Sequence, residues 1–493
     1  MHGLVPGIPT STGIPKDAVP RCDGACGDGR DRPGHDAGGD RRRVRQSFRR
    51  LVLSVPYPTW LRAETSFAVV IIVVGVIAGL GGMLLALLLH GIQHVAYGYD
   101  VGAIATPESF LQGVTAASPT RRVIVLTLTG AVAGGGWWAL YRFGRPLVSI
   151  KAAIGEDAPG PRMPALSTAA HALLQIITVA LGSPLGREVA PREIGAMLAT
   201  WVSFWADLSS EETRIVIACG AGAGLAAVYN VPLGGAVFVL EVLLKTTAPR
   251  AVTAALAASV TGSTIAWIGL GDVSQYVMPP LEISRPLVAA SIVAGPVFGL
   301  AAYGFRIITR LATSHAVHSW KMVPRCLVVF LAIGVVATLF PQLPGNGKGP
   351  SQLGFDGDLG TGLSASLLIL KLAAVAASLR VGAAGGVLTP SLTIGALLAT
   401  ALCPILNLIF PGISPAGFAV VGAAAFLASS MNMTLTAILL TLEFTRVRHD
   451  FCVPIFLAVA GSIVMLRMCT NLVPRTAPPY RAIFIRFLNS RRV

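Results

Sequence analysis

Gly220–Val242 reads GAGAGLAAVYNVPLGGAVFVLEV, and Gly422–Phe444 reads GAAAFLASSMNMTLTAILLTLEF. The second segment repeats the first at a shift of 202 residues, with identical residues at nine aligned positions. A general excess of small residues explains the matched Gly and Ala positions, but it does not explain the matched Asn230 and Glu241. The repeat predicts that the chain consists of two homologous halves.

A second pair of segments lies upstream of the first. Residues 186–200 read GREVAPREIGAMLAT, and residues 386–400 read GVLTPSLTIGALLAT, which share the pattern I-G-A-x-L-A-T at a shift of 200 residues. Two such halves with a substrate site at their interface are typical of secondary transporters and related channels. We expect the halves to be inverted relative to each other.

The composition predicts an all-α, polytopic membrane protein. Of 493 residues, 54% are hydrophobic and 12% are charged, against roughly 25% charged in soluble domains. Residues 381–442 contain no Asp, Glu, Lys or Arg. Further uncharged runs reach or approach the ~20 residues that a helix needs to span a bilayer: Ser66–Ile92, Val123–Tyr141, Ala251–Gly271 and Leu287–Phe305. Abundant Gly and Pro inside these runs indicate tilted and broken helices, which a membrane tolerates where the exposed backbone is buried or lines a cavity.

These patterns give the expected organisation of the chain. Residues 1–55 form a disordered basic tail without the apolar stretch of a signal peptide, and residues 56–493 form the membrane domain. Within that domain we expect the first repeat at about 66–245, the second at about 287–467 and a final helix at about 474–490. Seven scattered cysteines imply neither a disulfide framework nor a closed metal site, so no cofactor is expected.

We interpret the net charge of +15 as a sign of membrane topology and not of nucleic-acid binding. Excess Lys and Arg in a membrane protein concentrate in cytoplasmic loops and tails. Both termini are therefore expected in the cytoplasm, because basic residues cluster before the first span and after the last: Arg41, Arg42, Arg43, Arg45, Arg49 and Arg50, then Arg481, Arg486, Arg491 and Arg492.

Two broken helices are the candidate functional site. Gly182–Ile194 and Gly382–Ile394 each combine glycines, a proline near a helix start and a following apolar helix. A helix N-terminus inside a membrane presents unpaired N–H groups and the positive end of its dipole, and so it can bind an anion. The alternative is that both segments are ordinary re-entrant turns packed by small residues.

At these positions the chain resembles the CLC family of chloride channels and chloride/proton antiporters. Gly186-Arg187-Glu188 matches the start of the family signature G-R-E-G-P, although Val189-Ala190 follow and Pro191 comes one place late. Residues 385–390, GGVLTP, match G-G-x-F-x-P with Leu388 for Phe, and residues 220–235 match the G-x-A-A-G-L-A-A-x-F-N-x-P-L-x-G stretch with Tyr229 for Phe. The resemblance covers about residues 60–490.

The resemblance implies roles for individual residues. Glu188 corresponds to the gating glutamate, whose carboxylate occupies the outer anion site and swings away when it is protonated or displaced. Arg187 is expected to contact loop carbonyls. The anion-binding set is expected to comprise Gly186, the backbone N–H groups of Val387 and Leu388, and the hydroxyl of Tyr480, with chloride as the bound substrate ion.

The chain departs from the family in three places. Arg145 occupies the slot of the selectivity serine in G-S-G-I-P, so either Arg145 reaches the pathway or Ser149 substitutes one turn later. Val242 stands where antiporters carry the inner, proton-relaying glutamate, while Glu241 recurs as Glu443 and is predicted to be structural. Arg192 introduces a charge into the helix after the gate, either paired with Glu188 four residues earlier or turned toward a polar vestibule.

We therefore predict a non-enzymatic, multi-pass cell-membrane protein that conducts chloride or similar small anions passively through a gated, CLC-type pathway. The resemblance also implies a homodimer. The alternatives are a chloride/proton antiporter, a fluoride-selective relative and, remotely, an intramembrane serine protease built on Ser183 and His171. His90 and His94 could be metal ligands, but helix-end histidines at an interface are the favoured interpretation.

Overall fold

The structure is a computed structural model that describes residues 59–98 and 110–472. Within these ranges the chain forms 17 α-helices and no strand, which confirms the predicted all-α class. Eight of these helices are long and apolar enough to cross a membrane. The expected basic tail, the final helix at 474–490 and Tyr480 lie outside the described residues.

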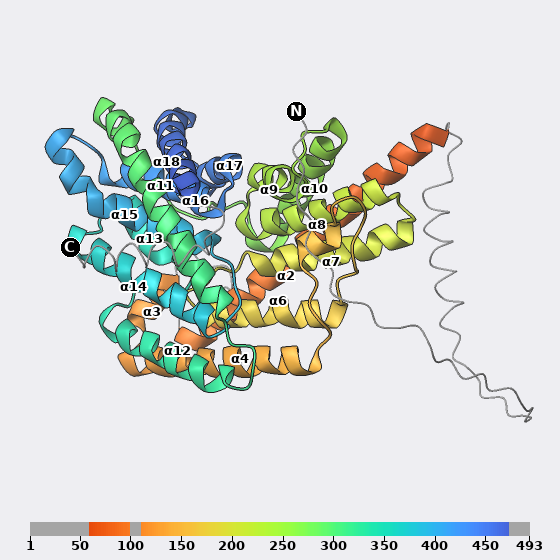
Figure 1. The fold of residues 1–493 in the computed structure, drawn as a ribbon, viewed down its shortest axis with the longest axis horizontal. Coiled ribbons are helices and arrows are strands. Elements are labelled where there is room, and N and C mark those ends of the chain that lie inside the picture. Colours follow the sequence, from red (N-terminus) through yellow and green to blue (C-terminus); the bar gives the residue numbers. More distant parts are fainter. Residues whose placement is uncertain (1–58, 99–109, 473–493) are drawn as a thin grey trace, which may run out of the picture. The chain divides into compact units, whose positions relative to one another are not determined.

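The long helices occur in corresponding order in the two halves, and α3 of the first half has no counterpart between α11 and α12 (Figure 1). The first half contains α2 (Thr59–Tyr97), α3 (Phe110–Ala116), α4 (Pro119–Phe143), α5 (Ile150–Ile154), α6 (Ala165–Ala180), α7 (Val189–Ala206), α8 (Ser210–Tyr229), α9 (Pro232–Phe238), the π-helix η1 (Val239–Leu244) and α10 (Pro249–Leu270). The second half contains α11 (Arg285–Ser314), α12 (Met322–Leu339), α13 (Lys348–Asp356), α14 (Thr361–Arg380), α15 (Leu388–Ile409), α16 (Pro415–Met431), α17 (Thr434–Thr445), the 3₁₀ turn η2 (His449–Phe451) and α18 (Cys452–Leu472).

Packing repeats between the halves as well. In the first half α7 packs on α8 and α2 packs on α10, while in the second α15 packs on α16 and α11 packs on α18. The repeat partners α4 and α12 also pack directly against each other, as do α9 and α17. These contacts confirm the predicted two-half architecture.

The asparagines matched in the sequence repeat end equivalent helices. Asn230 terminates α8 with φ 54°, and Asn432 terminates α16 with φ 55°. Asn tolerates this left-handed conformation better than most residues with a side chain. The chain then turns into α9 after α8 and into α17 after α16. An asparagine therefore forms the equivalent turn in each half.

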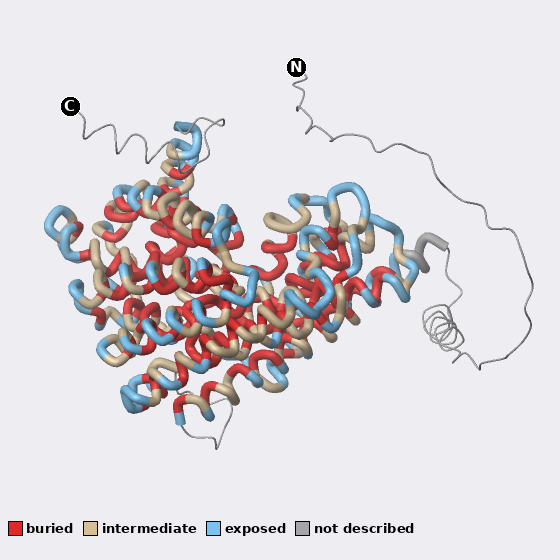
Figure 2. Tube along the Cα trace, turned by 60° about the horizontal axis from the view of Figure 1, so that its bottom comes forward, coloured by how far each residue is buried: buried red, intermediate tan, exposed pale blue. Residues whose placement is uncertain are grey.

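Small residues let the central helices approach closely. Every residue of α8 from Ile215 to Tyr229 is buried, and α16 is buried in the same way from Ala416 to Ser430. Figure 2 shows that buried segments run through the interior of the molecule. A Cβ added at Gly195 would meet the backbone of Gly220. Membrane helices use such small-residue contacts because lipid supplies no hydrophobic driving force between them.

Glu241 and Glu443 join the two halves in a reciprocal way. The Glu241 carboxylate accepts hydrogen bonds from the backbone N–H groups of Leu435 (3.1 Å) and Thr436 (2.7 Å) at the start of α17. The Glu443 carboxylate accepts from Leu233 (2.9 Å) and Gly234 (2.6 Å) at the start of α9. Each glutamate thus caps a helix of the opposite half, which confirms the structural role predicted for both.

Candidate functional site

The two broken helices meet at their N-terminal ends. The Gly186 N–H donates to the Gly386 carbonyl oxygen (2.7 Å), and the Gly386 N–H donates to the Gly186 carbonyl oxygen (2.9 Å), which forms an isolated antiparallel bridge. Helix α7 begins at Val189 and α15 at Leu388, so both lead away from this bridge. The two halves therefore run in opposite senses, as predicted, and two positive helix ends converge on one point.

Glu188 fills the space between these helix ends. Its side chain is completely buried, and its Oε1 accepts a hydrogen bond of 2.7 Å from the backbone N–H of Leu388. Its Oε2 lies 3.4 Å from both the Tyr229 hydroxyl and the Thr389 hydroxyl, which are 3.1 Å apart. The carboxylate of the first half therefore occupies the N-terminus of the broken helix of the second half, where the positive helix end stabilises a negative charge.

Glycines form the walls around the carboxylate. A Cβ added to Gly186 would overlap the Glu188 carboxylate oxygens, and a Cβ added to Gly386 would overlap Oε1 and Cδ. Neither glycine has a positive φ. Space for the carboxylate, rather than backbone strain, requires glycine at both positions.

The sequence did not identify Tyr229 and Thr389 as site residues. Tyr229 is buried at the end of α8, and its ring also lies under the Arg187 guanidinium at 5.1 Å. The sequence did contain an indication of the role of Tyr229: it stands at a motif position that is usually Phe, and the replacement of Phe by Tyr adds a hydroxyl there. Thr389 lies in the first turn of α15 next to the predicted Leu388.

Among the described residues, Arg187 donates to a side chain of a loop and to no loop carbonyl. Its Nη2 donates to the Gln275 side-chain oxygen at 3.4 Å, and Gln275 lies between α10 and α11. Gln275 in turn donates to the Tyr229 carbonyl at 3.2 Å. Arg187 was expected to contact backbone carbonyls of a loop, and the contact that the structure shows is to a loop side chain instead.

Arg192 does not contact the gate carboxylate. Its Nε donates to the backbone carbonyl of Glu188 at 2.8 Å, and its guanidinium lies 5.1 Å from the centre of the Phe238 ring. The neighbouring Glu193 pairs with His171 of α6 at 2.8 Å. The expected Glu188–Arg192 carboxylate pair is therefore absent from the described residues, and the guanidinium lies against an aromatic ring.

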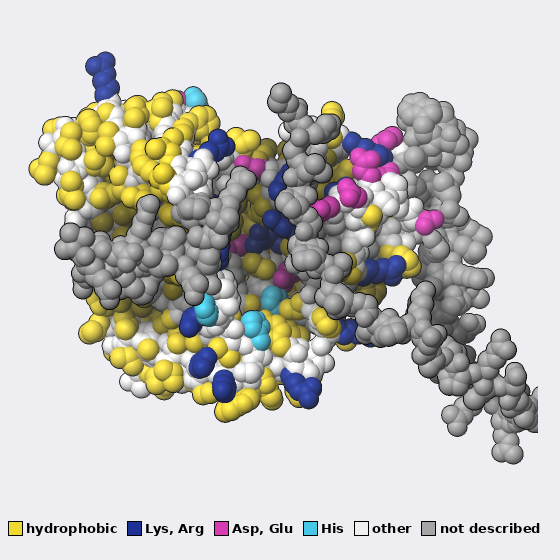
Figure 3. Space-filling model, in the orientation of Figure 1, with side chains coloured by type: hydrophobic (Ala, Val, Ile, Leu, Met, Phe, Trp, Pro, Cys, Tyr) yellow, Lys and Arg dark blue, Asp and Glu magenta, His cyan; other side chains and the backbone are white. Residues whose placement is uncertain are grey.

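Figure 3 shows that the molecular surface is hollowed between the two halves, and that basic, acidic and histidine side chains line the hollow. The surrounding surface is mainly hydrophobic, with exposed apolar side chains on the outer helix faces. Such a distribution suits a protein with lipid around it and a polar route inside it.

The structure locates the remaining predicted site residues. Arg145 is exposed before α5, and its backbone N–H donates to Ser167 Oγ at 2.9 Å. Ser149 is the N-cap of α5 and accepts from the Ala152 N–H at 3.2 Å. Val387 is the N-cap of α15, and Val242 lies half-buried in η1. The assignments of these residues remain predictions.

The two remote interpretations gain no support from the described residues. Ser183 Oγ accepts from the Leu185 N–H, while the His171 ring contacts Glu193 and Gln175, so no Ser–His pair forms among the described residues. No group of three metal-ligating side chains occurs among the residues searched, which include His90 and His94.

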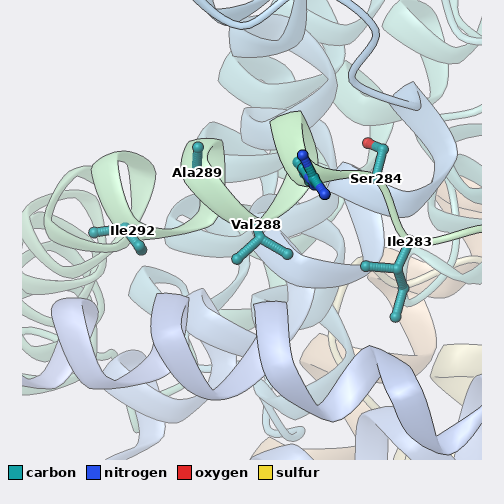
Figure 4. A pocket seen from close by; sticks show the side chains of 6 residues that line it. Ile283, Ser284, Val288, Ala289 and Ile292 are labelled. Carbon is teal, nitrogen blue, oxygen red and sulfur yellow. The ribbon is translucent and has the colours of Figure 1, made fainter.

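A surface pocket of about 380 Å³ lies at the start of α11 (Figure 4). None of its lining residues belongs to the predicted site: they are Ile283, Ser284, Arg285, Val288, Ala289 and Ile292. The pocket is mainly apolar and carries no convergent set of chemical groups.

Comparisons with known proteins agree with this geometry. A family model described as voltage gated chloride channel matches residues 126–467, more than half of the chain. The chain is 28% identical over 385 residues to a putative chloride channel protein ClcB-like of Ralstonia nicotianae, covering 75% of this chain and 86% of that protein. It is 29% identical over 361 residues to the voltage-gated ClC-type chloride channel ClcB of Escherichia coli, covering 68% and 82%.

Solved structures show the same fold. A slow cyanobacterial Cl⁻/H⁺ antiporter matches with a TM-score of 0.71 at 20% identity, covering 87% of this chain and 99% of that one. A CLC-type fluoride/proton antiporter matches with a TM-score of 0.57 at 19% identity, covering 83% and 98%.

Proposed function

The chain belongs to the voltage-gated chloride channel family, the CLC family, and on this premise we propose that it conducts chloride or similar small anions passively through a pathway gated by Glu188. It is a multi-pass membrane protein with at least eight apolar helices in its described residues. The proposal includes a homodimer with both termini in the cytoplasm and an anion pathway in each subunit.

The position of the Glu188 carboxylate carries the proposal. Its Oε1 accepts a hydrogen bond of 2.7 Å from the backbone N–H of Leu388, the first residue of α15. The carboxylate lies between Gly186 and Gly386. A carboxylate and a halide compete for the same N–H donors, because both are anions stabilised by a helix N-terminus. When the side chain leaves, the Leu388 N–H and the hydroxyls of Tyr229 and Thr389 become available to an anion.

Passive conduction is supported by the residue at the proton-relay position. Val242 cannot accept or release a proton, and its neighbour Glu241 is engaged as the cap of α17. The alternative is antiport, which solved relatives perform. Fluoride selectivity is a further alternative, since Arg145 takes the place of the selectivity serine and a solved relative is a fluoride/proton antiporter.

Reconstituted flux measurements test the proposal. Valinomycin is added to liposomes loaded with potassium chloride or potassium fluoride, an electrode selective for the loaded anion records anion efflux, and a pH electrode records proton movement. We expect chloride efflux without proton movement against its gradient, and efflux that is slower with fluoride than with chloride inside. Proton uptake at a fixed ratio to chloride would establish antiport, faster fluoride efflux would establish a fluoride pathway, and efflux equal to that of protein-free liposomes would refute anion transport.

A further inference from the structure

Arg192 carries a charge beside the gate but makes no hydrogen bond with the gate carboxylate. It lies in the second turn of α7, half-buried, and its side chain extends back toward the start of that helix. The Nε donates to the Glu188 carbonyl at 2.8 Å, which holds the guanidinium beside the residue that gates the pathway. On its other side lies the buried Phe238 of α9.

Most donors of this guanidinium lack a protein acceptor. An arginine side chain has five N–H donors, and among the described residues only the Nε of Arg192 donates to a protein atom. No carboxylate pairs with it there, because Glu188 points at Leu388 and Glu193 pairs with His171. The remaining donors are left for water or a ligand.

Another buried arginine of this protein shows what a structural arginine does. Arg122 donates through Nε, Nη1 and Nη2 to the carbonyls of Val114 (2.7 Å), Ala337 (3.2 Å) and Thr115 (2.7 Å) respectively. All three of its nitrogen atoms therefore satisfy helix-end carbonyls, whose partial charge is negative. Arg192 makes one such bond and lies at the opposite type of helix end.

The position of Arg192 is electrostatically unfavourable unless an anion is present. A helix N-terminus carries a partial positive charge, and a cation there raises the local free energy. The Glu188 carboxylate compensates for this charge while the gate is closed. Once that carboxylate leaves, the nearest remaining carboxylate on α7 is Glu193, which is paired with His171 and accepts no hydrogen bond from the guanidinium.

We propose that Arg192 is an additional anion-binding residue that holds a small monovalent anion beside the first turn of α7, on the side facing Phe238. This inference rests on the proposed function and adds a site to it. The anion would receive charge-assisted hydrogen bonds from the guanidinium, which are roughly twice as strong as neutral ones. A fixed positive charge at this point would also repel protons, so that anions pass without them.

Bromide labelling of the wild-type protein tests the site directly. Crystals of the full chain grown in sodium bromide, with data collected at the bromine absorption edge, should show an anomalous peak in contact with the Arg192 guanidinium. A peak at the Leu388 N–H without one at Arg192 would refute the additional site. This measurement requires no variant, so it does not depend on whether a substitution folds.

Calorimetric chloride titration distinguishes anion binding by the Arg192 charge from a role of Arg192 in positioning α7. Arg192→Gln should raise the chloride dissociation constant at least ~10-fold, whereas Arg192→Lys should keep it within ~3-fold, because Lys retains the charge but not the guanidinium geometry. Arg162→Gln is the matched control: Arg162 is exposed and also lies over an aromatic ring, 3.7 Å from the centre of Phe204. Equal losses in the Gln and Lys variants would show that Arg192 only positions α7, and wild-type affinity in Arg192→Gln would show that it binds no anion.

The same liposome assay distinguishes failure of the proposed anion transport from failure of the additional site at Arg192. Absence of anion efflux in the wild type would refute the proposed function itself. Wild-type efflux combined with unchanged chloride affinity in Arg192→Gln would refute only the additional site.

Discussion

Replacing Glu188 with Gln should open the pathway, because the gate is held closed mainly by charge. The substitution exchanges a charge-assisted hydrogen bond to the Leu388 N–H (2.7 Å) for a neutral one. That exchange weakens the bond by about 1–2 kcal/mol, and loss of the carboxylate charge at the helix ends removes about 1 kcal/mol more. A total of about 2–3 kcal/mol raises the ratio of open to closed gates ~30- to ~140-fold.

Chloride efflux from liposomes measures this change. If the wild-type gate is mostly closed, Glu188→Gln should speed efflux by at least ~10-fold, and acidification should no longer accelerate it. Glu211→Gln is the control, since Glu211 is an exposed glutamate in the first turn of α8. Equal efflux from wild type and Glu188→Gln, with both proteins monodisperse, would show that Glu188 is not the gate.

Three further predictions concern selectivity and stability. Arg145→Ser should leave the chloride, bromide and nitrate affinities unchanged in calorimetric titration, because Arg145 is exposed; an altered halide order would return Arg145 to the pathway. Glu443→Ala leaves the N–H groups of Leu233 and Gly234 at the start of α9 without their acceptor. The free energy of unfolding in detergent should therefore fall by about 1–3 kcal/mol. A melting curve equal to that of the wild type would contradict this. The Asn230 amide, followed by Arg446, lowers the pKa of Asp272 below its usual range. The stabilisation from this carboxylate is therefore present above the unfolded-state pKa and is lost as the pH falls, so the melting-temperature difference between wild type and Asp272→Asn should shrink below about pH 4.

The sequence predicted the architecture because the repeat is made of residues with geometric roles. Asn230 and Asn432 end equivalent helices in the left-handed conformation, and Glu241 and Glu443 cap helices of opposite halves. Such residues keep their identity and spacing in both halves, so a shifted comparison of the chain with itself reveals them. The meeting of the two broken helices followed from the same repeat.

Side-chain direction could not be predicted from spacing. Glu188 and Arg192 are four residues apart and share a helix face, but the carboxylate turns toward Leu388 of the other half. Two of its partners lie about 200 residues away in sequence and the third, Tyr229, lies 41 residues away, so no local pattern reports on them. The same limit applies to Thr389 and to the pairing of Glu193 with His171, which depend on how α6, α7 and α15 pack.

The two glycines around the carboxylate offer a way to unlock the gate without altering its chemistry. An alanine methyl at Gly186 or Gly386 would occupy the volume that the Glu188 oxygens now fill, while the backbone at both positions can accept a side chain. The flexible glutamate would then be the group that moves, because its end is the nearest obstacle. A single methyl group in either half would therefore exclude the Glu188 carboxylate from its site. The variant would keep its ionisable gate residue, but its gate would stay open at every pH.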